Sequence, residues 1–145
     1  MSLSRIDVHF LKMASMVSQQ DPHAIVSGKF RAGSKKHRGC IFAKGNKKLV
    51  DGVNTHLGGE LYKPDTEERY VATVNAEIVA LGKAIRAGIA PLAEITSYST
   101  SCPNWFTFKV LVTAGVRRFV HYGATTSERT KHYAQELGVE IIGVG

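Results

Sequence analysis

The sequence has few cysteines and no long apolar run. Cys40 and Cys102 are its only cysteines, and both lie in or beside apolar segments, which is typical of reduced, buried thiols. We therefore expect two free thiols. No apolar run approaches the roughly 20 residues that a membrane-spanning helix needs, and the first residues show no signal-peptide pattern. The sequence predicts a soluble, cytoplasmic protein with no membrane partner.

Acidic residues are absent between residues 29 and 48, a segment that is rich in lysine and arginine in a chain of net charge +7. Such a cluster can form a solvated basic surface, or it can attract nucleotide phosphates or a nucleic acid backbone. Both interpretations stay open at this point. The residues that would contact a nucleic acid are Lys29, Arg31, Lys35, Lys36, Arg38, Lys47 and Lys48.

The length of 145 residues and the hydrophobic content of 43% predict a single domain over residues 1–145. Residues 27–37 and 55–70 are rich in glycine and charge, so we expect loops there. Between these loops, two short apolar segments at 39–43 and 48–53 flank a Lys-Gly-Asn-Lys turn and predict a β-hairpin.

Helices, glycines and strands alternate in the rest of the chain. An amphipathic helix is predicted near the start, and three more helices are each followed by a glycine and a strand. Such repeated units favour parallel strands joined by right-handed crossovers. The predicted helices span 6–17, 75–86, 104–114 and 127–137, and the predicted strands span 95–100, 117–122 and 139–144.

Two short motifs carry the strongest functional signal. They are Thr73-Val74-Asn75-Ala76-Glu77 at the start of one predicted helix and Pro103-Asn104-Trp105-Phe106-Thr107 at the start of the next. Zinc deaminases carry H-x-E and P-C-x-x-C at such places, where the histidine and two cysteines hold Zn²⁺ and the glutamate transfers protons. In this chain the glutamate and the proline are present, and the zinc ligands are replaced.

The motifs and the order of elements resemble the cytidine and deoxycytidylate deaminase superfamily over most of the chain. Phe10-Leu11-Lys12-Met13-Ala14 with Asp21-Pro22 looks like the opening helix and turn of deoxycytidylate deaminases, and Gly52-Val53-Asn54 looks like their G-Y-N segment. Residues 109–118 look like the run that follows the second cysteine ligand. The resemblance implies an α/β fold, a three-layer sandwich whose central five-stranded mixed sheet has helices on both faces.

The resemblance also implies roles for individual residues. Aligning on Ala114-Gly115 places the two cysteine positions at Asn104 and Thr107, and the histidine position at Asn75. Glu77 then stands at the proton-shuttle position, although a carboxylate is also favoured at any helix N-terminus. Trp105 can stack on a base or pack in the core. The ligand-binding residues that we expect are Asn54, Asn75, Ser101, Asn104, Trp105 and Thr107.

Amides and hydroxyls are poor ligands for a tetrahedral zinc ion, so we expect neither the zinc of this superfamily nor another cofactor. Zinc lowers the pKa of bound water from about 15.7 to about 7, and losing this shift removes about 12 kcal/mol from the formation of hydroxide. Cys102, beside Pro103, could act as a displaced ligand, but a packed thiol is the more ordinary role.

Three functions stay open after the sequence analysis. The first is a nucleotide- or nucleobase-binding protein of the deaminase fold, without zinc-dependent deamination. The second is an active nucleoside or nucleotide deaminase, a hydrolase with a substitute metal site. The third is a nucleic-acid-binding partner subunit that uses the basic segment. By resemblance, we also expect a homo-oligomer.

Overall fold

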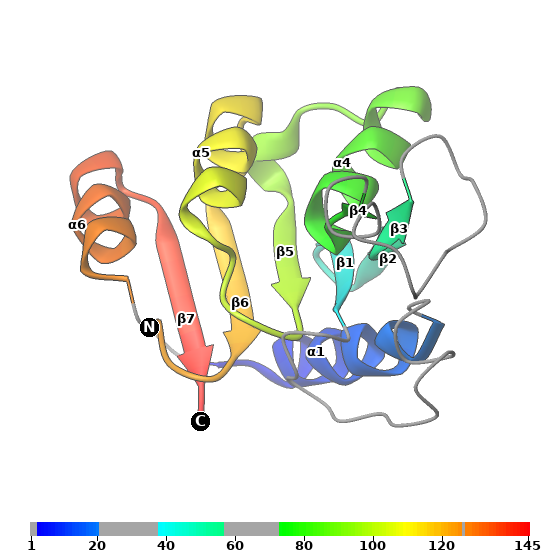
Figure 1. Cartoon of the computed structure of the whole chain (residues 1–145), viewed down its shortest axis with the longest axis horizontal. Coiled ribbons are helices and arrows are strands. Elements are labelled where there is room, and N and C mark those ends of the chain that lie inside the picture. Colours follow the sequence, from blue (N-terminus) through cyan, green and yellow to red (C-terminus); the bar gives the residue numbers. More distant parts are fainter. Residues whose placement is uncertain (1–2, 21–37, 57–72, 126) are drawn as a thin grey trace.

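The computed structural model describes residues 3–20, 38–56, 73–125 and 127–145. Its centre is a five-stranded sheet whose strands lie in the order β2, β1, β5, β6, β7 (Figure 1). β1 pairs antiparallel with β2 and β5, whereas β5, β6 and β7 run parallel, so the sheet is mixed as predicted. The strands are β1 (Gly39–Lys44), β2 (Lys47–Val53), β5 (Thr96–Ser99), β6 (Arg118–Tyr122) and β7 (Glu140–Val144).

Helices cover both faces of the sheet, which confirms the predicted three-layer sandwich. In Figure 1, α1 (Arg5–Val17) lies across one face, and α4 (Ala76–Arg86), α5 (Trp105–Ala114) and α6 (Glu128–Leu137) lie side by side on the other. Two short 3₁₀ helices, Ser18–Gln20 and Leu92–Glu94, complete the helical elements of the described residues. Each strand from β5 to β7 is preceded by a helix, as the repeated units of the sequence predict.

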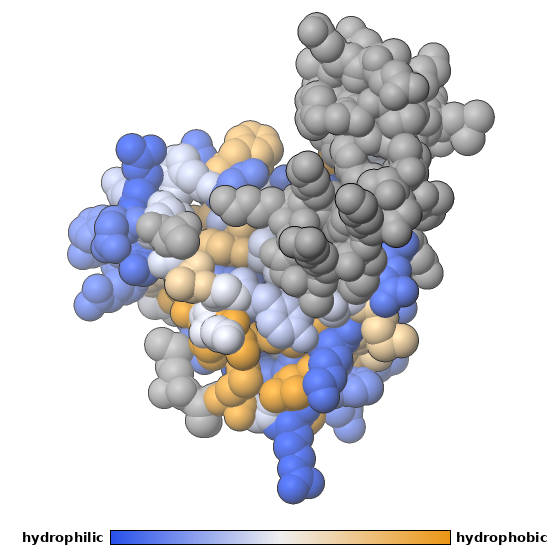
Figure 2. Space-filling view, turned by 60° about the horizontal axis from the view of Figure 1, so that its bottom comes forward, coloured by the Kyte–Doolittle hydropathy of each residue, from blue (hydrophilic) through white to orange (hydrophobic). Residues whose placement is uncertain are grey.

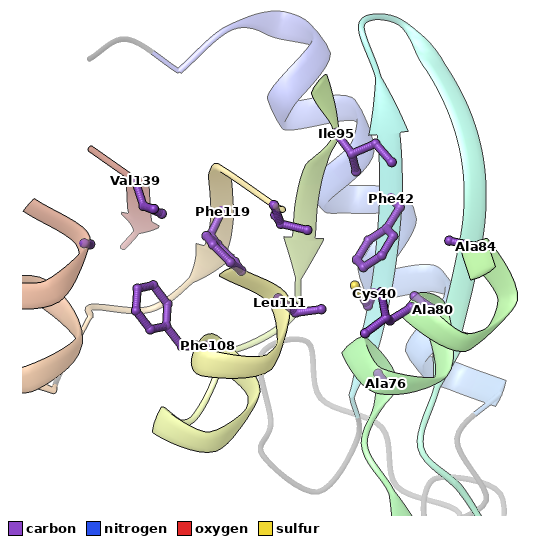
Figure 3. Packing of buried hydrophobic residues seen from close by; sticks show 13 residues of the cluster. Cys40, Phe42, Ala76, Ala80, Ala84, Ile95, Phe108, Leu111, Phe119 and Val139 are labelled. Carbon is purple, nitrogen blue, oxygen red and sulfur yellow. The ribbon is translucent and has the colours of Figure 1, made fainter. Parts of the chain in front are cut away.

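Successive side chains of β1 belong to two different hydrophobic cores, one on each face of the sheet. Cys40 and Phe42 are fully buried against α4 and α5, together with residues such as Leu111 (Figure 3). Ile41 and Ala43 point to the opposite face and pack with apolar residues of α1. Because successive side chains of a strand face opposite sides, β1, which lies between β2 and β5, contributes to both cores.

A buried ion pair fastens α1 to the sheet. Asp7 accepts hydrogen bonds from two nitrogens of Arg118, at 2.7 and 2.8 Å, and from the hydroxyl of Tyr98 at 2.6 Å. Asp7 also belongs to a capping box with Ser4 at the start of α1. The hydrogen bonds from Arg118 hold the pKa of Asp7 well below its ordinary value of 3.8, although burial opposes this shift.

The predicted hairpin and helices are present, with small shifts at their ends. Asn75, Asn104 and Ser127 were predicted as first residues of helices, and the structure shows each as an N-cap whose side chain accepts a backbone hydrogen bond. Gly115 and Gly138 follow α5 and α6 with φ of 115° and 68°, the left-handed region that favours glycine.

The prediction of a loop over 55–70 is wrong at its start. Thr55–His56 forms a short strand, β3, that pairs antiparallel with β4 (Thr73–Val74) in a separate two-stranded sheet. Strands of two residues have no periodicity that a sequence pattern could reveal. Residues 57–70 of that segment, and the predicted loop at 27–37, lie outside the described residues.

Cys40 and Cys102 are free thiols, as predicted. Within the described ranges, no helix is long and apolar enough to cross a membrane. Figure 2 shows a face on which apolar side chains, in orange, lie among polar ones in blue. Among the described residues, the large apolar side chains that are exposed lie on the helices or beside them. They are Leu3, Ile6, Val8, Met16, Ile85, Phe106, Tyr133 and Leu137.

Candidate functional site

The N-termini of α4 and α5 meet at the candidate site. Asn75 caps α4 by accepting a hydrogen bond from the backbone N–H of Ile78 at 3.0 Å. Asn104 caps α5 in the same way, accepting from the backbone N–H of Thr107 at 2.8 Å. Asparagine is a favoured N-cap because its side-chain oxygen satisfies a backbone N–H that has no partner within the helix. The caps thus bring two positive helix ends to one region.

A direct hydrogen bond joins the two helix starts. The amide nitrogen of Asn75 donates to the hydroxyl of Thr107 at 2.7 Å. Thr107 is fully buried, while Asn104 is exposed and directs its oxygen back to its own helix. Of the three positions where the sequence resemblance expects zinc ligands, two are therefore bonded to each other and the third is used as a cap.

Asn54 connects the end of β2 to the same region. Its side-chain oxygen accepts a hydrogen bond from the backbone N–H of Ala76 at 3.0 Å, so a second asparagine satisfies a backbone N–H at the start of α4. The strand can approach the helix this closely because residue 52 is glycine: a Cβ atom at Gly52 would lie 2.2 Å from the carbonyl oxygen of Ala76. Asn54 itself is buried, and its predicted contact with a ligand stays a prediction.

Glu77, in the first turn of α4, forms a buried ion pair with Arg38. Nη2 of Arg38 lies 2.7 Å from Oε2 of Glu77, and the side chains are 12% and 0% exposed. The same nitrogen donates to the carbonyl oxygen of Cys102 at 3.4 Å. An ion pair that is removed from water needs good geometry to offset the free-energy cost of desolvation. This ion pair links the residue before β1 to the first turn of α4 and, through Cys102, to the segment that precedes α5.

The side chains of Glu77 and Ser101 each contain a buried polar atom that lacks a hydrogen-bond partner among the described residues. These atoms are Oε1 of Glu77, the oxygen that does not face Arg38, and the hydroxyl oxygen of Ser101. Ser101 is adjacent in sequence to Cys102, whose carbonyl contacts Arg38. Buried polar groups are nearly always hydrogen-bonded, so such atoms indicate a place where a further molecule supplies the partner.

Cys40 and His121 lie close enough to the ion pair for its charges to affect their pKa values. Burial, followed by the nearby charge of Glu77, raises the pKa of the Cys40 thiol to about 12, which makes this thiol unreactive. Burial also lowers the pKa of His121, and the charge of Arg38 adds to this effect. Nδ1 of His121 lies 2.9 Å from the carbonyl oxygen of Tyr122, so this nitrogen carries the proton, and Nε2 accepts from Thr125.

Trp105 contributes to the packing of α5 against α6. Its ring stacks with Phe108 at 6.0 Å and lies 5.4 Å from the ring of Tyr133. Lys109 and Arg129 place their charges over the same ring, at 5.4 and 5.5 Å from its centroid. The packing role that the sequence left open is thus visible in the structure, and a stacked base stays a prediction.

The donor set at this site is unsuited to zinc. Across the described residues, no group of three or more histidine, cysteine, aspartate or glutamate side chains is arranged to hold a metal ion. Asn75 and Thr107 offer only neutral oxygens, and these are already engaged. In addition, the guanidinium of Arg38 would repel a dication beside Glu77.

The basic segment divides into several environments. The charge of Arg38 is neutralised within the fold, and sequence analysis assigned this residue to a nucleic acid surface instead. Lys48 pairs with Asp51. Lys47 is exposed on the β1–β2 hairpin. The other members of the predicted nucleic acid surface, Lys29, Arg31, Lys35 and Lys36, lie outside the described residues.

Several solved structures have a fold similar to that of this chain. The apo dCMP deaminase of cyanophage S-TIM5 superposes with a TM-score of 0.74 and 22% identity, covering 99% of this chain and 100% of that one. The complex of the same enzyme with dCMP and dUMP gives 0.75 and 20% with the same coverage. A tRNA:A34 deaminase gives 0.64 and 16%, covering 94% of this chain and 98% of that one.

No protein-family model matches the chain, and no curated protein matches it in a sequence search. The likeness to solved structures therefore concerns the fold, which is that of the cytidine and deoxycytidylate deaminase superfamily. The fold that the sequence motifs predicted is confirmed.

Proposed function

We propose that the protein binds a nucleotide between the N-termini of α4 and α5 and does not catalyse zinc-dependent deamination. The observation that carries this proposal is the hydrogen bond between Asn75 and Thr107, two residues at positions expected to hold zinc in a deaminase. Their polar atoms stabilise each other and the helix ends. The site is thereby organised as a protein hydrogen-bond network in which a metal has no ligands to bind.

The charge of the site supports the same conclusion. In a zinc deaminase the glutamate acts beside a dication. Here a guanidinium occupies the neighbourhood of Glu77, at 2.7 Å from its carboxylate. Arg38 compensates the buried negative charge, but it cannot act as a Lewis acid that turns water into hydroxide. Glu77 alone does not replace the contribution of about 12 kcal/mol that the metal provides.

Three features support a nucleotide as the ligand. The unpartnered atoms of Glu77 and Ser101 are suited to the edge of a base, which presents donors and acceptors. The converging helix N-termini favour an anionic group. The similar dCMP deaminase of cyanophage S-TIM5 was solved with dCMP and dUMP, so a pyrimidine nucleotide is the first ligand to test.

The first experiment tests the metal. Elemental analysis of the purified protein should find less than about one tenth of a zinc ion per chain, because thiolate and imidazole are absent from the expected positions. The triple variant Asn75→His, Asn104→Cys, Thr107→Cys should gain zinc binding. Stoichiometric zinc in the unmodified protein would contradict the proposal. A folded triple variant that takes up no zinc, even when Arg38→Met is added, would show that these are not the ligand positions.

The second experiment tests the ligand by calorimetric titration. A deoxynucleoside monophosphate should bind more tightly than its nucleoside, and added salt should weaken the difference. The variant Ser101→Ala should weaken binding without lowering the free energy of unfolding, since the hydroxyl oxygen has no partner within the described structure. Absence of saturable binding for every deoxynucleoside monophosphate would refute the proposal.

Thr130→Val is a matched control for the serine variant. The hydroxyl oxygen of Thr130 is also buried and also lacks a partner in the part of the chain that the structure describes, but it lies on α6. We expect this variant to be as stable as the unmodified protein and to bind the nucleotide equally well. A similar loss of binding in both variants would mean that the effect of Ser101→Ala is not local to the site.

A further inference from the structure

The ion pair with Arg38 determines what Glu77 can offer to a ligand. A guanidinium is permanently protonated, and at 2.7 Å it pairs with a carboxylate that is ionised. An ionised carboxylate only accepts hydrogen bonds. Its second oxygen, Oε1, is buried and has no partner in the described ranges. A ligand that reaches this oxygen must therefore present a donor.

Ser101 supplies a group of the complementary kind. Its hydroxyl oxygen is buried and unpartnered among the residues described, and a hydroxyl can donate as well as accept. The residue lies close to the ion pair, because the carbonyl of the adjacent Cys102 accepts from the same nitrogen of Arg38 that contacts Glu77. Beside the guanidinium of Arg38, which only donates, the site thus contains an obligatory acceptor in Glu77 and a hydroxyl in Ser101 that can donate.

We propose that the site between the starts of α4 and α5 selects a lactam base, in which a ring N–H lies beside a carbonyl, over an amidine base such as cytosine. The ring N–H would donate to Oε1 of Glu77, and the adjacent carbonyl would accept from the hydroxyl of Ser101. In cytosine the corresponding ring nitrogen is an acceptor, so its lone pair would face the carboxylate. This inference rests on the proposed function, because it specifies which nucleotides the same site binds.

The size of the preference follows from the burial of Oε1. Glu77 has no exposed surface, so water cannot replace a missing donor once the ligand is in place. A site that hydrogen-bonds a ligand through buried groups rejects an analogue that lacks the matching atom. We expect dUMP to bind at least about tenfold more tightly than dCMP, in accordance with the loss of one hydrogen bond to a charged group.

The experiment compares three probes with the full chain. Calorimetric titration uses dUMP, dCMP and the N3-methyl derivative of dUMP, which keeps both carbonyls of uracil and lacks the ring N–H. The expected order is dUMP tightest, with dCMP and the N3-methyl derivative both weaker. The methylated probe differs from dUMP only at the ring nitrogen that would contact Glu77, where a methyl group replaces the hydrogen, so binding as tight as that of dUMP would exclude the proposed hydrogen bond.

A variant tests the acceptor. In Glu77→Gln the side chain can donate as well as accept, so the preference for dUMP over dCMP should disappear. Glu128→Gln is the matched control, since Glu128 also lies in the first turn of a helix but is exposed and pairs with Lys131. That control should keep the preference. If Glu77→Gln does not fold, the comparison of dUMP with dCMP on the unmodified protein still tests the inference, because equal binding of the two would overturn it.

The outcomes separate this inference from the proposed function. Binding of dCMP as tight as that of dUMP, or equal binding of the methylated and unmethylated probes, would overturn the lactam preference and leave nucleotide binding intact. Failure of all deoxynucleoside monophosphates to bind would overturn both. A preference for dUMP that Glu77→Gln abolishes and Glu128→Gln keeps would establish the role of the carboxylate.

Discussion

Replacing Arg38 by methionine should destabilise the fold strongly, because it leaves the carboxylate of Glu77 buried without a counter-charge. Glu77 is fully buried and Arg38 is 12% exposed, so water offers little compensation. Removing one partner of a buried ion pair typically costs about 3–5 kcal/mol of the free energy of unfolding. Methionine keeps much of the aliphatic bulk, so most of this loss comes from the charge.

Urea unfolding followed by circular dichroism measures this effect. The double variant Arg38→Met, Glu77→Gln should recover most of the lost stability, because no unpaired charge remains. Lys131→Met, which breaks the exposed pair with Glu128, is the control and should cost less than about 1 kcal/mol. A loss below about 1 kcal/mol in Arg38→Met, or a double variant as unstable as the single one, would refute the argument.

Two further predictions concern stability. The lowered pKa of Asp7 means that its ion pair with Arg118 stabilises the fold fully above pH 3.8 and is lost as the pH falls below that value. Asp7→Asn should therefore flatten the acid side of a plot of urea midpoint against pH. An unchanged acid slope would contradict the role of this residue. Gly52→Ala should lower the melting temperature because its Cβ would meet a backbone oxygen at 2.2 Å, whereas Gly82→Ala, in the middle of α4, has room and should raise it. Equal shifts in the two glycine variants would show that close approach is not the reason for glycine at position 52.

The fold could be predicted because its signals are local and repeated. The glycines after α5 and α6 lie at backbone angles that other residues avoid, so they mark helix ends in the sequence as they do in the structure. Asparagine and serine at helix starts were assigned to the helices instead of to the caps, a shift of one residue. Short-range patterns define an element better than they define its boundary.

The site could be predicted only in part. Sequence motifs brought Asn75, Thr107 and Glu77 to one region, and the structure joins the first two by a hydrogen bond. The partner of Glu77 was missed, because Arg38 precedes it by 39 positions and stood in a run of basic residues that favoured a surface role. A signal was available: a glutamate at a helix start against the core needs a counter-charge, and Arg38 directly precedes β1, a strand with five buried residues.

The absence of histidine and cysteine from positions 75, 104 and 107 and the presence of Arg38 have a common electrostatic consequence. A buried carboxylate needs a neighbouring positive charge, which a dication supplies in a zinc deaminase and Arg38 supplies here. A zinc ion placed beside Glu77 would therefore be repelled by the guanidinium of Arg38. Restoring the ligands by Asn75→His, Asn104→Cys and Thr107→Cys should therefore give weaker zinc binding than the same variant that also carries Arg38→Met.

Competition titration with a chromophoric chelator measures this difference. We expect the variant without Arg38 to bind zinc at least about tenfold more tightly, because a repulsive charge in a water-poor site has been removed. Zinc should also restore the stability that Arg38→Met costs, since binding to the folded state alone raises the free energy of unfolding. Equal zinc affinities with and without Arg38 would mean that the charge of the guanidinium does not act at the position of the metal.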